Sequence, residues 1–260
     1  MEKWDAEKYL LFENERTQPA IDLAAVIHFV HPSKIIDIGC GPGNSTEVLA
    51  RRYPNACILG IDNSKEMIAA AAKSHPGLAF QVFDAGSDLS PLGNDFDVVF
   101  SNACIQWIPD HKNLLSRMFS LLNKGGILAV QVPMIWKEPI HKDLEAISSA
   151  PEWSGYFHMP NLFYHLKQGE YCDILAENAS DFRAWETIYI HRMKSHKDIL
   201  EWYRSTGLRP YLGALPEEKK EKFENEFLAS LVDNYPKQKN GEILFRFPRF
   251  FFAAVKQNPA

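Results

Sequence analysis

Five short apolar runs organise the first half of the chain, with helical patterns between them. Buried parallel strands are continuous apolar runs, whereas strands with one solvated face alternate apolar and polar positions. The runs therefore predict a parallel sheet flanked by helices, which is an α/β fold. The predicted strands lie at about residues 35–38, 56–62, 78–83, 96–101 and 127–132.

The pattern changes after Pro133. Residues 133–165 have no clear period and residues 195–240 are polar and helical, so we expect two cap insertions in a single domain covering residues 1–260. Further strands are predicted at 187–191 and 243–255, and Pro248 in the second favours a bulge or a late start. Residues 1–30 predict a helical lid before the core at 30–132, with its second short helix starting at Pro19.

A glycine-rich turn follows the first predicted strand, in the stretch from Lys34 to Asn44. Gly39, Gly41 and Gly43 alternate with other residues, and residues 44–46 offer side chains that could cap the next helix. Glycines permit a sharp turn and let a ligand approach the backbone without meeting a Cβ atom. A strand, a glycine turn and a helix together are typical of a doubly wound nucleotide-binding fold.

The charges around this turn narrow the choice of ligand. The glycine spacing is GxGxG rather than the GxGxxG of dinucleotide sites, and Asp37 stands just before the first glycine. A carboxylate there would repel a pyrophosphate and attract an ammonium group. Asp62 ends the second predicted strand, where an acid suits a ribose diol. An ammonium and a ribose without a phosphate indicate S-adenosylmethionine.

Composition excludes several classes of protein. The chain has 260 residues and a net charge of −5, which argues against nucleic acid as a partner. Its four cysteines show no CxxC pair or zinc spacing, so we expect no metal site and reduced thiols in the cytoplasm. No apolar run reaches the roughly 18 residues that span a membrane. We expect no signal peptide, no membrane association and a monomer.

The turn, with Asp62, Asp84 and the strand end Ser101-Asn102, resembles class I S-adenosylmethionine-dependent methyltransferases over about residues 30–132. The resemblance implies a doubly wound, seven-stranded, mostly parallel Rossmann-like sheet with helical cap insertions. It also implies cofactor-binding roles: Asp37 for the methionyl ammonium, Asp62 for the ribose, Asp84 for the adenine amino group and the backbone of Asn102 near the methionyl part. After Asp84 this chain reads Ala-Gly-Ser-Asp, where the resemblance leads us to expect an apolar residue that packs on adenine, so Ala85 is a candidate contact.

A closer similarity, to the trans-aconitate 2-methyltransferase family, covers nearly the whole chain. It is carried by motifs inside and outside the common fold, among them Tyr9, Phe12, Arg16, Pro19, Gln106-Trp107, Pro109-Asp110-His111, Trp136, Tyr164, Tyr171, Thr206-Gly207-Leu208-Arg209-Pro210 and Phe247-Pro248-Arg249. The resemblance implies esterification of a carboxylate of trans-aconitate or of a similar small polycarboxylate.

The implied chemistry sets the expected site residues. A carboxylic acid has a reference pKa near ~4, so the attacking carboxylate is ionised without a general base and we expect no catalytic side chain. A polycarboxylate instead requires cations, and arginine pairs with carboxylates in a bidentate way. The predicted substrate-binding residues are the cations and pocket walls Arg16, Trp107, Trp136, Tyr164, Arg209 and Arg249, with Arg246, Tyr189 and His191 as further candidates. His111 is expected to be a structural or capping residue.

Three alternatives remain open at this point. Another carboxyl methyltransferase, such as one acting on malonyl-acyl-carrier protein, would carry the same cofactor motifs. So would a non-catalytic S-adenosylmethionine-binding sensor. A NAD-dependent enzyme is disfavoured by Asp37 and by the glycine spacing.

Overall fold

The computed structural model describes residues 13–28, 31–157, 163–204 and 206–257. Residues 1–12 and 29–30 of the expected lid, and residues 158–162 of the first expected insertion, lie outside this described part. In chain order the elements are α2 (Glu13–Ala25), β1 (Lys34–Ile38), α3 (Asn44–Arg52), β2 (Cys57–Asp62), α4 (Lys65–Ser74), β3 (Ala79–Val82), η1 (Ser90–Leu92), β4 (Phe96–Asn102), η2 (Ile105–Trp107), α5 (His111–Ser120), β5 (Leu122–Pro133), α6 (Pro139–Ser148), η3 (Ser154–Tyr156), α7 (Gln168–Asn178), β6 (Ala179–Met193), α8 (His196–Arg204), α9 (Arg209–Ala214), α10 (Glu217–Asn234) and β7 (Ile243–Lys256).

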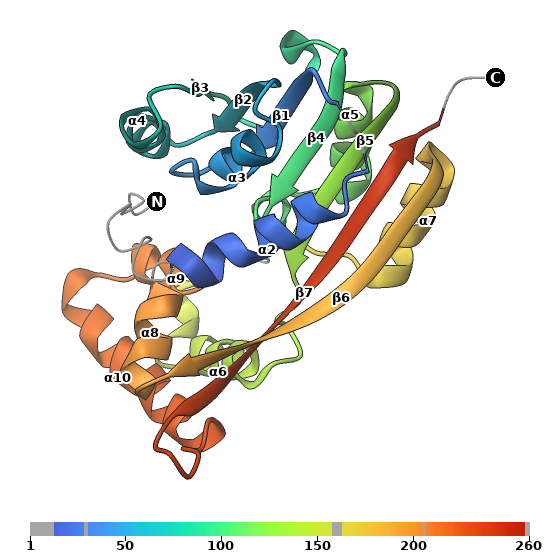
Figure 1. Ribbon diagram of the computed structural model, residues 1–260. Helices are drawn as coiled ribbons and strands as arrows, with labels where there is room; N and C mark the ends of the chain where they lie inside the picture. The colour runs from blue at the N-terminus through green and yellow to red at the C-terminus, as the bar shows by residue number, and fades with distance from the viewer. Residues whose placement is uncertain (1–12, 29–30, 158–162, 205, 258–260) are drawn as a thin grey trace. The chain divides into compact units, whose positions relative to one another are not determined.

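The seven strands form one sheet in the order β3-β2-β1-β4-β5-β7-β6. The pairs β1–β2, β1–β4, β2–β3 and β4–β5 are parallel, and Figure 1 shows β7 running opposite to β5. The strand order reverses direction between β1 and β4, which is where doubly wound sheets bind ligands. The predicted fold, a seven-stranded and mostly parallel α/β sheet, is confirmed.

The chain divides into two compact units. Of the described residues, the α/β unit contains 13–28, 31–133, 163–186 and 250–257, and the helical unit contains 134–157, 187–204 and 206–249. Strands β6 and β7 therefore contribute residues to both units. The helical unit includes most of both segments that the sequence predicted to be cap insertions.

Helices cover both faces of the strands in the α/β unit (Figure 1). α2 packs against α3 and β5, while α5 packs against β5 and α7. The strand centres are fully buried, as the continuous apolar runs predicted, and include Ile35, Ile36, Val98, Val99 and Leu128. The prediction that Pro19 starts a helix is wrong, because α2 begins at Glu13 and contains Pro19. Its apolar face (Ala20, Leu23 and Ala24) is buried, which offsets the hydrogen bond lost at proline.

An aromatic core holds the helical unit together. Trp153, Trp202, Phe223, Phe227 and Phe245 are buried to 1% exposure or less. The rings of Trp153 and Phe223 meet edge to face at 5.1 Å, and the indole Nε1 of Trp153 donates to Glu226 at 2.7 Å. This core joins α6, α8 and α10, so the unit has a packed interior of its own.

Three further element boundaries differ from the sequence predictions. Residues 139–148, which showed no clear period, form α6. β6 extends over fifteen residues rather than about five. β7 begins at Ile243 and runs through Pro248 without a break, and the Pro248 carbonyl accepts a hydrogen bond from the Met134 amide at 2.9 Å. Pro248 therefore occupies the strand interior instead of delaying its start.

Candidate functional site

Polar side chains gather at the carboxyl ends of adjacent parallel strands in the α/β unit. Asp37 is the fourth residue of β1, while Asp62 and Asn102 are the last residues of β2 and β4. β2 and β4 both pair with β1, so these three ends lie side by side at one edge of the sheet. The sequence predicted this convergence because successive parallel strands end at the same edge.

The glycine turn between β1 and α3 has a left-handed backbone at all three glycines, with φ values of 75°, 54° and 98° at Gly39, Gly41 and Gly43. A Cβ atom on Gly39 would lie 2.3 Å from the Cβ of Cys104, so Gly39 permits close packing of protein on protein. A Cβ on Gly41 would meet nothing within 4 Å. Gly41 is therefore the glycine of this turn that faces open space.

Asp37 is a fully buried carboxylate with one satisfied oxygen. Its Oδ2 accepts hydrogen bonds from the hydroxyls of Ser45 at 2.6 Å and Thr46 at 2.7 Å. Its Oδ1 is buried and has no hydrogen-bond partner among the described residues. Burial raises the pKa of Asp37 to about 6, the nearby Asp62 adds to this rise, and the two hydroxyls oppose it. An incoming cationic donor would satisfy Oδ1 and relieve the burial cost.

Ser45 and Thr46 were expected to be helix caps, and this expectation is wrong. α3 has Gly43 as its N-cap, with no side-chain cap. Both hydroxyls instead bond to Asp37, eight and nine residues earlier in the chain. Their hydrogen-bond capacity was visible in the sequence, but their partner depends on how the turn folds α3 back against β1.

Asp62 supports the turn from the next strand. Its Oδ2 accepts from the Gly41 amide at 3.1 Å, and its Oδ1 accepts from the Ser64 amide at 2.9 Å. Burial raises the pKa of Asp62, and the two amides oppose this rise. Each oxygen keeps a lone pair, so the carboxylate can accept further hydrogen bonds.

The two remaining predicted cofactor residues differ in exposure. Asp84 follows β3, is exposed, and accepts a hydrogen bond from the Gly86 amide at 2.9 Å. Asn102 is half-buried, and its Oδ1 is a buried acceptor with no hydrogen-bond partner in the described part of the chain. Asp37 and Asn102 thus both offer an unsatisfied oxygen at neighbouring strand ends.

The thiols near the turn do not supply a nucleophile. Burial, followed by the charges of Asp37 and Asp62, raises the pKa of Cys40. Burial and the same two carboxylates raise the pKa of Cys104 to about 12. Both thiols are therefore protonated near neutral pH, whereas a reactive cysteine requires a lowered pKa. No group of three His, Cys, Asp or Glu side chains that could hold a metal occurs among the described residues.

Three predicted substrate-binding residues belong to the α/β unit. Arg16 is 7% exposed and shares the buried face of α2 with Ala20. Trp107 lies in η2, with its ring 4.8 Å from that of Phe163. The Tyr164 amide donates to the Gln106 carbonyl at 2.8 Å, so segment 163–164 is tied to η2.

The other three, Trp136, Arg209 and Arg249, belong to the helical unit. Arg209 is the first residue of α9 and is half-buried, as is Trp136. Arg249 is only 4% exposed, and its Cζ lies 4.7 Å from the ring centroid of Phe247 and 5.9 Å from that of Tyr189. Arg16 and Arg249 are the only buried Lys or Arg side chains in the described part of the chain.

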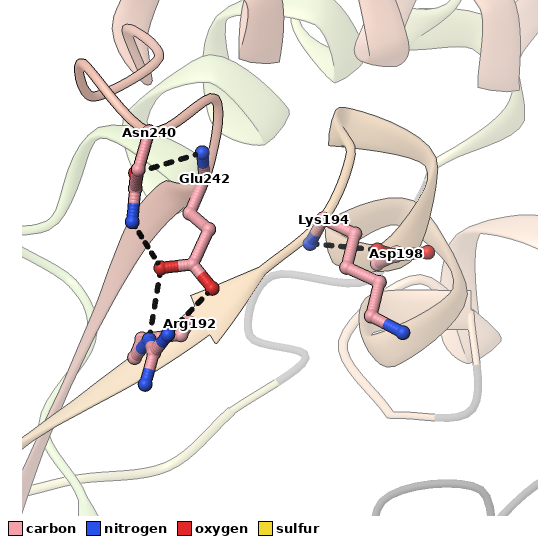
Figure 2. A network of polar contacts seen from close by, with 5 residues as sticks. All are labelled: Arg192, Lys194, Asp198, Asn240 and Glu242. Atoms are coloured by element: carbon pink, nitrogen blue, oxygen red, sulfur yellow. Dashed lines mark hydrogen bonds and ion pairs between the residues drawn. The ribbon is translucent and has the colours of Figure 1, made fainter.

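Two exposed or half-buried arginines of the helical unit are paired with carboxylates. Figure 2 shows Arg192 donating to both oxygens of Glu242, at 2.9 and 2.7 Å, while Asn240 bonds to the same carboxylate. Arg204 similarly donates to both oxygens of Glu224, at 2.6 and 2.8 Å. The guanidinium of Arg249 lies by the rings of Phe247 and Tyr189, and such aromatic contacts orient a cation.

Comparisons with known proteins agree with this geometry. A family model described as "Methyltransferase domain" matches residues 35–126. A trans-aconitate 2-methyltransferase of Methylobacterium nodulans is 40% identical over 98% of both chains. One from Rhodopseudomonas palustris is 40% identical over 98% of this chain and 100% of its own, and one from Rhizobium etli is 39% identical over 97% and 99%.

Solved structures share the fold at low identity. The YcgJ protein from Bacillus subtilis matches with a TM-score of 0.58 and 14% identity, over 93% of this chain and 100% of its own. A Haemonchus contortus phosphoethanolamine N-methyltransferase, solved in complex with S-adenosyl-L-methionine, matches with a TM-score of 0.53 and 20% identity over 93% and 53%. No helix in the described part of this chain has the length and apolar character needed to cross a membrane.

Proposed function

The chain belongs to the trans-aconitate 2-methyltransferase family of S-adenosylmethionine-dependent methyltransferases, and we propose that it esterifies a carboxylate of trans-aconitate or of a similar small polycarboxylate. The observation that carries the proposal is the full-length similarity to relatives that bear this name. The buried guanidinium group of Arg249 agrees with an anionic acceptor, because arginine pairs with carboxylates in a bidentate way. The relatives' names also favour an enzyme over a non-catalytic sensor.

The strand ends provide groups that fit S-adenosylmethionine, which supplies an electrophilic sulfonium methyl when bound. We propose that Asp37 Oδ1 accepts a hydrogen bond from the methionyl ammonium, since this buried oxygen has no partner among the described residues. Asn102 Oδ1 is a second acceptor for the methionyl part. Asp62 would accept the ribose hydroxyls while holding the Gly41 amide, and Asp84 would accept the adenine amino group.

No catalytic acid or base is proposed, because the acceptor carboxylate is ionised at neutral pH. The contribution of the chain is to bind the two reactants, to align them and to exclude water, which lowers a barrier by roughly 7–11 kcal/mol at best. Arg16, Arg209 and Arg249 are proposed to hold acceptor carboxylates, with Trp107, Trp136 and Tyr164 as walls. We also propose that the protein is a monomer and that it is located in the cytoplasm. Its cysteines Cys40, Cys57, Cys104 and Cys172 are free thiols, which agrees with a cytoplasmic location.

A methyl-transfer assay on a panel of carboxylates tests the acceptor. We expect trans-aconitate to be methylated with a kcat/KM about 10- to 100-fold above that of a dicarboxylate such as fumarate, because each lost carboxylate forgoes a charge-assisted hydrogen bond worth roughly 1.5–3 kcal/mol. Crotonate, with one carboxylate, should react more slowly still. Turnover of malonyl-acyl-carrier protein without turnover of trans-aconitate would refute the proposed acceptor and leave the methyl donor unchanged.

The affinity for the cofactor should depend on pH through Asp37. Only ionised Asp37 attracts the methionyl ammonium, and its pKa in the ligand-free protein is about 6. The dissociation constant for S-adenosylhomocysteine, which retains the ammonium, should be nearly constant above pH 7 and rise about tenfold from pH 7 to pH 5. Calorimetric titrations at both pH values measure this. A constant affinity over the range would contradict either the raised pKa or the role of Asp37.

A further inference from the structure

The segment from Asn102 to Trp107 connects the glycine turn to a proposed wall of the acceptor site. Cys104 packs directly on Gly39, where even a Cβ atom would overlap it at 2.3 Å. Trp107 ends the same segment three residues later. Ala103 between Asn102 and Cys104 has a φ of 53°, a left-handed conformation that costs a non-glycine residue about 1 kcal/mol or more. Surrounding contacts must therefore hold this segment in place.

Three backbone carbonyls of the segment accept hydrogen bonds from a side chain or from residues outside the segment. The Gln106 side-chain amide donates to the Ala103 carbonyl at 2.7 Å. The Tyr164 amide donates to the Gln106 carbonyl at 2.8 Å. The imidazole Nε2 of His111, 3% exposed, lies 2.9 Å from the Ile105 carbonyl. His111 thus holds the turn that carries Trp107 from the side of α5.

The hydrogen-bond partners of His111 determine its tautomer. A carbonyl oxygen only accepts, so Nε2 carries the proton and donates it to Ile105. Nδ1 of the neutral ring is then an acceptor, and the Tyr171 hydroxyl donates to it at 2.6 Å. Burial lowers the pKa of His111, which keeps the ring neutral. His111 therefore has a structural role, one of the two roles expected from the sequence, while Asp110 is the N-cap of α5.

Tyr171 connects this contact to a second segment. Its ring is fully buried, 5.7 Å from the rings of both Phe250 and Phe252. Its hydroxyl also accepts a long hydrogen bond, 3.5 Å, from the Leu166 amide. Residues 163–166 are therefore connected to segment 102–107 at both ends. Phe163 and Tyr164 contact the segment directly, whereas Leu166 is connected to it through Tyr171 and His111.

We propose that His111 and Tyr171 are positioning residues for the methyl transfer, which fix segment 102–107 against the glycine turn and so align Trp107 and the acceptor with the methyl donor. Neither residue needs to touch substrate to do this, because His111 acts through the Ile105 carbonyl. The inference rests on the proposed function, which places the acceptor beside Trp107. A misplacement of about 1 Å in such an arrangement can lower the rate by roughly a hundredfold.

Substitutions of His111 separate positioning from folding. The amide of His111→Gln can place a donor near the position of Nε2, whereas the shorter His111→Asn cannot reach the Ile105 carbonyl. We expect kcat/KM for the acceptor to fall roughly thirtyfold in His111→Asn and at least several-fold less in His111→Gln. The dissociation constant of S-adenosylhomocysteine should change less than about threefold in both, because the proposed ligands of the cofactor are untouched.

A tyrosine pair provides the matched control. Tyr171→Phe removes a hydroxyl that His111 uses, and should lower kcat/KM about tenfold while the ring still packs on Phe250 and Phe252. Tyr203 is equally buried, and its hydroxyl has no hydrogen-bond partner among the described residues, so Tyr203→Phe should stay within about twofold of the unmodified protein. Imidazole ¹⁵N spectra should show the Nε2–H tautomer of His111, with a displaced Nδ1 resonance in Tyr171→Phe.

Assays at a temperature where every variant is folded remove the contribution of stability. Unchanged kcat/KM in His111→Asn, equal losses in His111→Gln and His111→Asn, or a loss of cofactor affinity as large as the loss of kcat/KM would each overturn the inference. If the unmodified protein methylates a different acceptor, the proposed acceptor fails, and the same comparison with that acceptor still tests the positioning role.

Discussion

Replacing Asp37 with asparagine is expected to weaken cofactor binding about a hundredfold while making the ligand-free protein more stable at pH 8. The loss of affinity follows from removing the charge that faces the methionyl ammonium, since a hydrogen bond between charged groups contributes roughly 1.5–3 kcal/mol. Affinity falls while stability rises, because burying the Asp37 carboxylate without its cationic partner costs free energy in the ligand-free protein. Its Oδ1 has no hydrogen-bond partner among the described residues.

The gain in stability follows from the raised pKa of this carboxyl group. The pKa of Asp37 is about 6 in the fold, above its ordinary value, so the folded protein favours the protonated form. The contribution of Asp37 to the free energy of unfolding is complete below about pH 4 and is lost as the pH rises through 6. At pH 8 the loss is about 3 kcal/mol. Asparagine avoids that loss. Its amide nitrogen lacks an acceptor, at a cost of about 1–2 kcal/mol, so the net gain is about 1–2 kcal/mol.

Urea unfolding at pH 8, with and without S-adenosylhomocysteine, measures both effects. The variant should have the higher free energy of unfolding without ligand, and the unmodified protein should have the higher value with ligand at a hundred times its dissociation constant, which adds about 2.7 kcal/mol. A variant that is less stable under both conditions would contradict the account. So would an unchanged affinity measured by calorimetry.

Asp97 provides a matched control in the same sheet. It is also buried, but its Oδ2 accepts from the amide and hydroxyl of Ser33 at 2.6 and 2.8 Å, and from the Lys34 amide at 3.1 Å. These hydrogen bonds, with one from Asn123, outweigh burial and lower the pKa of Asp97. Asp97→Asn should therefore destabilise the ligand-free protein and leave cofactor affinity unchanged. It lies at the amino end of β4, away from the strand ends that form the site.

The contrast between Asp37 and Asp97 shows what the sequence could predict. The positions of Asp37, Asp62 and Asn102 at strand ends follow from apolar runs and from the turn glycines, which are local signals. Whether a buried acid is satisfied depends on donors that folding brings near it. Ser45 and Thr46 have hydroxyls that local rules assign to a helix cap, yet both bond to Asp37. The unsatisfied Oδ1 could not be inferred without the fold.

The helical unit was predicted less well, for a related reason. α6 was missed although its buried residues Ile140 and Leu144 lie four positions apart, as in a helix, because one such repeat in a ten-residue segment is a weak signal. Both residues pack into a core built from distant segments. The Tyr235 hydroxyl, for example, accepts a hydrogen bond from the Ile140 amide at 3.2 Å, across 95 positions of the sequence. Tertiary contacts of this kind stabilise a short helix whose own sequence signal is weak, whereas a buried parallel strand leaves a continuous apolar run.

Replacing Arg249 with lysine is expected to raise the KM for trans-aconitate about a hundredfold while cofactor affinity stays unchanged. Lysine keeps the positive charge but loses the bidentate fork and the flat group that lies by Phe247, at 4.7 Å from its centroid. Steady-state kinetics with varied acceptor, and calorimetry with S-adenosylhomocysteine, measure the two quantities. Arg192→Lys is the matched control and should leave both unchanged, because Arg192 is exposed and already paired with Glu242 (Figure 2). The same two measurements on Arg209→Lys test the proposed role of Arg209.

His191 gives a second, independent measure of this binding. Burial, and then the nearby Arg249, lower the pKa of His191 to about 4. Among the described groups that face this imidazole, Arg249 on β7 is the only charged side chain. The others are aromatic: Tyr189 on β6, Trp202 on α8, and Phe245 and Phe247 on β7. A carboxylate bound by Arg249 would offset the guanidinium charge, so the pKa of His191 should rise when trans-aconitate is added.

An NMR titration of His191 in the protein saturated with S-adenosylhomocysteine tests this, because that ligand has no methyl group to transfer. The rise in pKa should be present with trans-aconitate and absent with crotonamide, which carries no charge. A KM effect of Arg249→Lys without any change at His191 would mean that Arg249 acts through the packing of β7 and does not bind the acceptor. A rise at His191 in the unmodified protein that disappears in Arg249→Lys would assign the carboxylate to this guanidinium, since lysine retains the charge and only the fork has been removed.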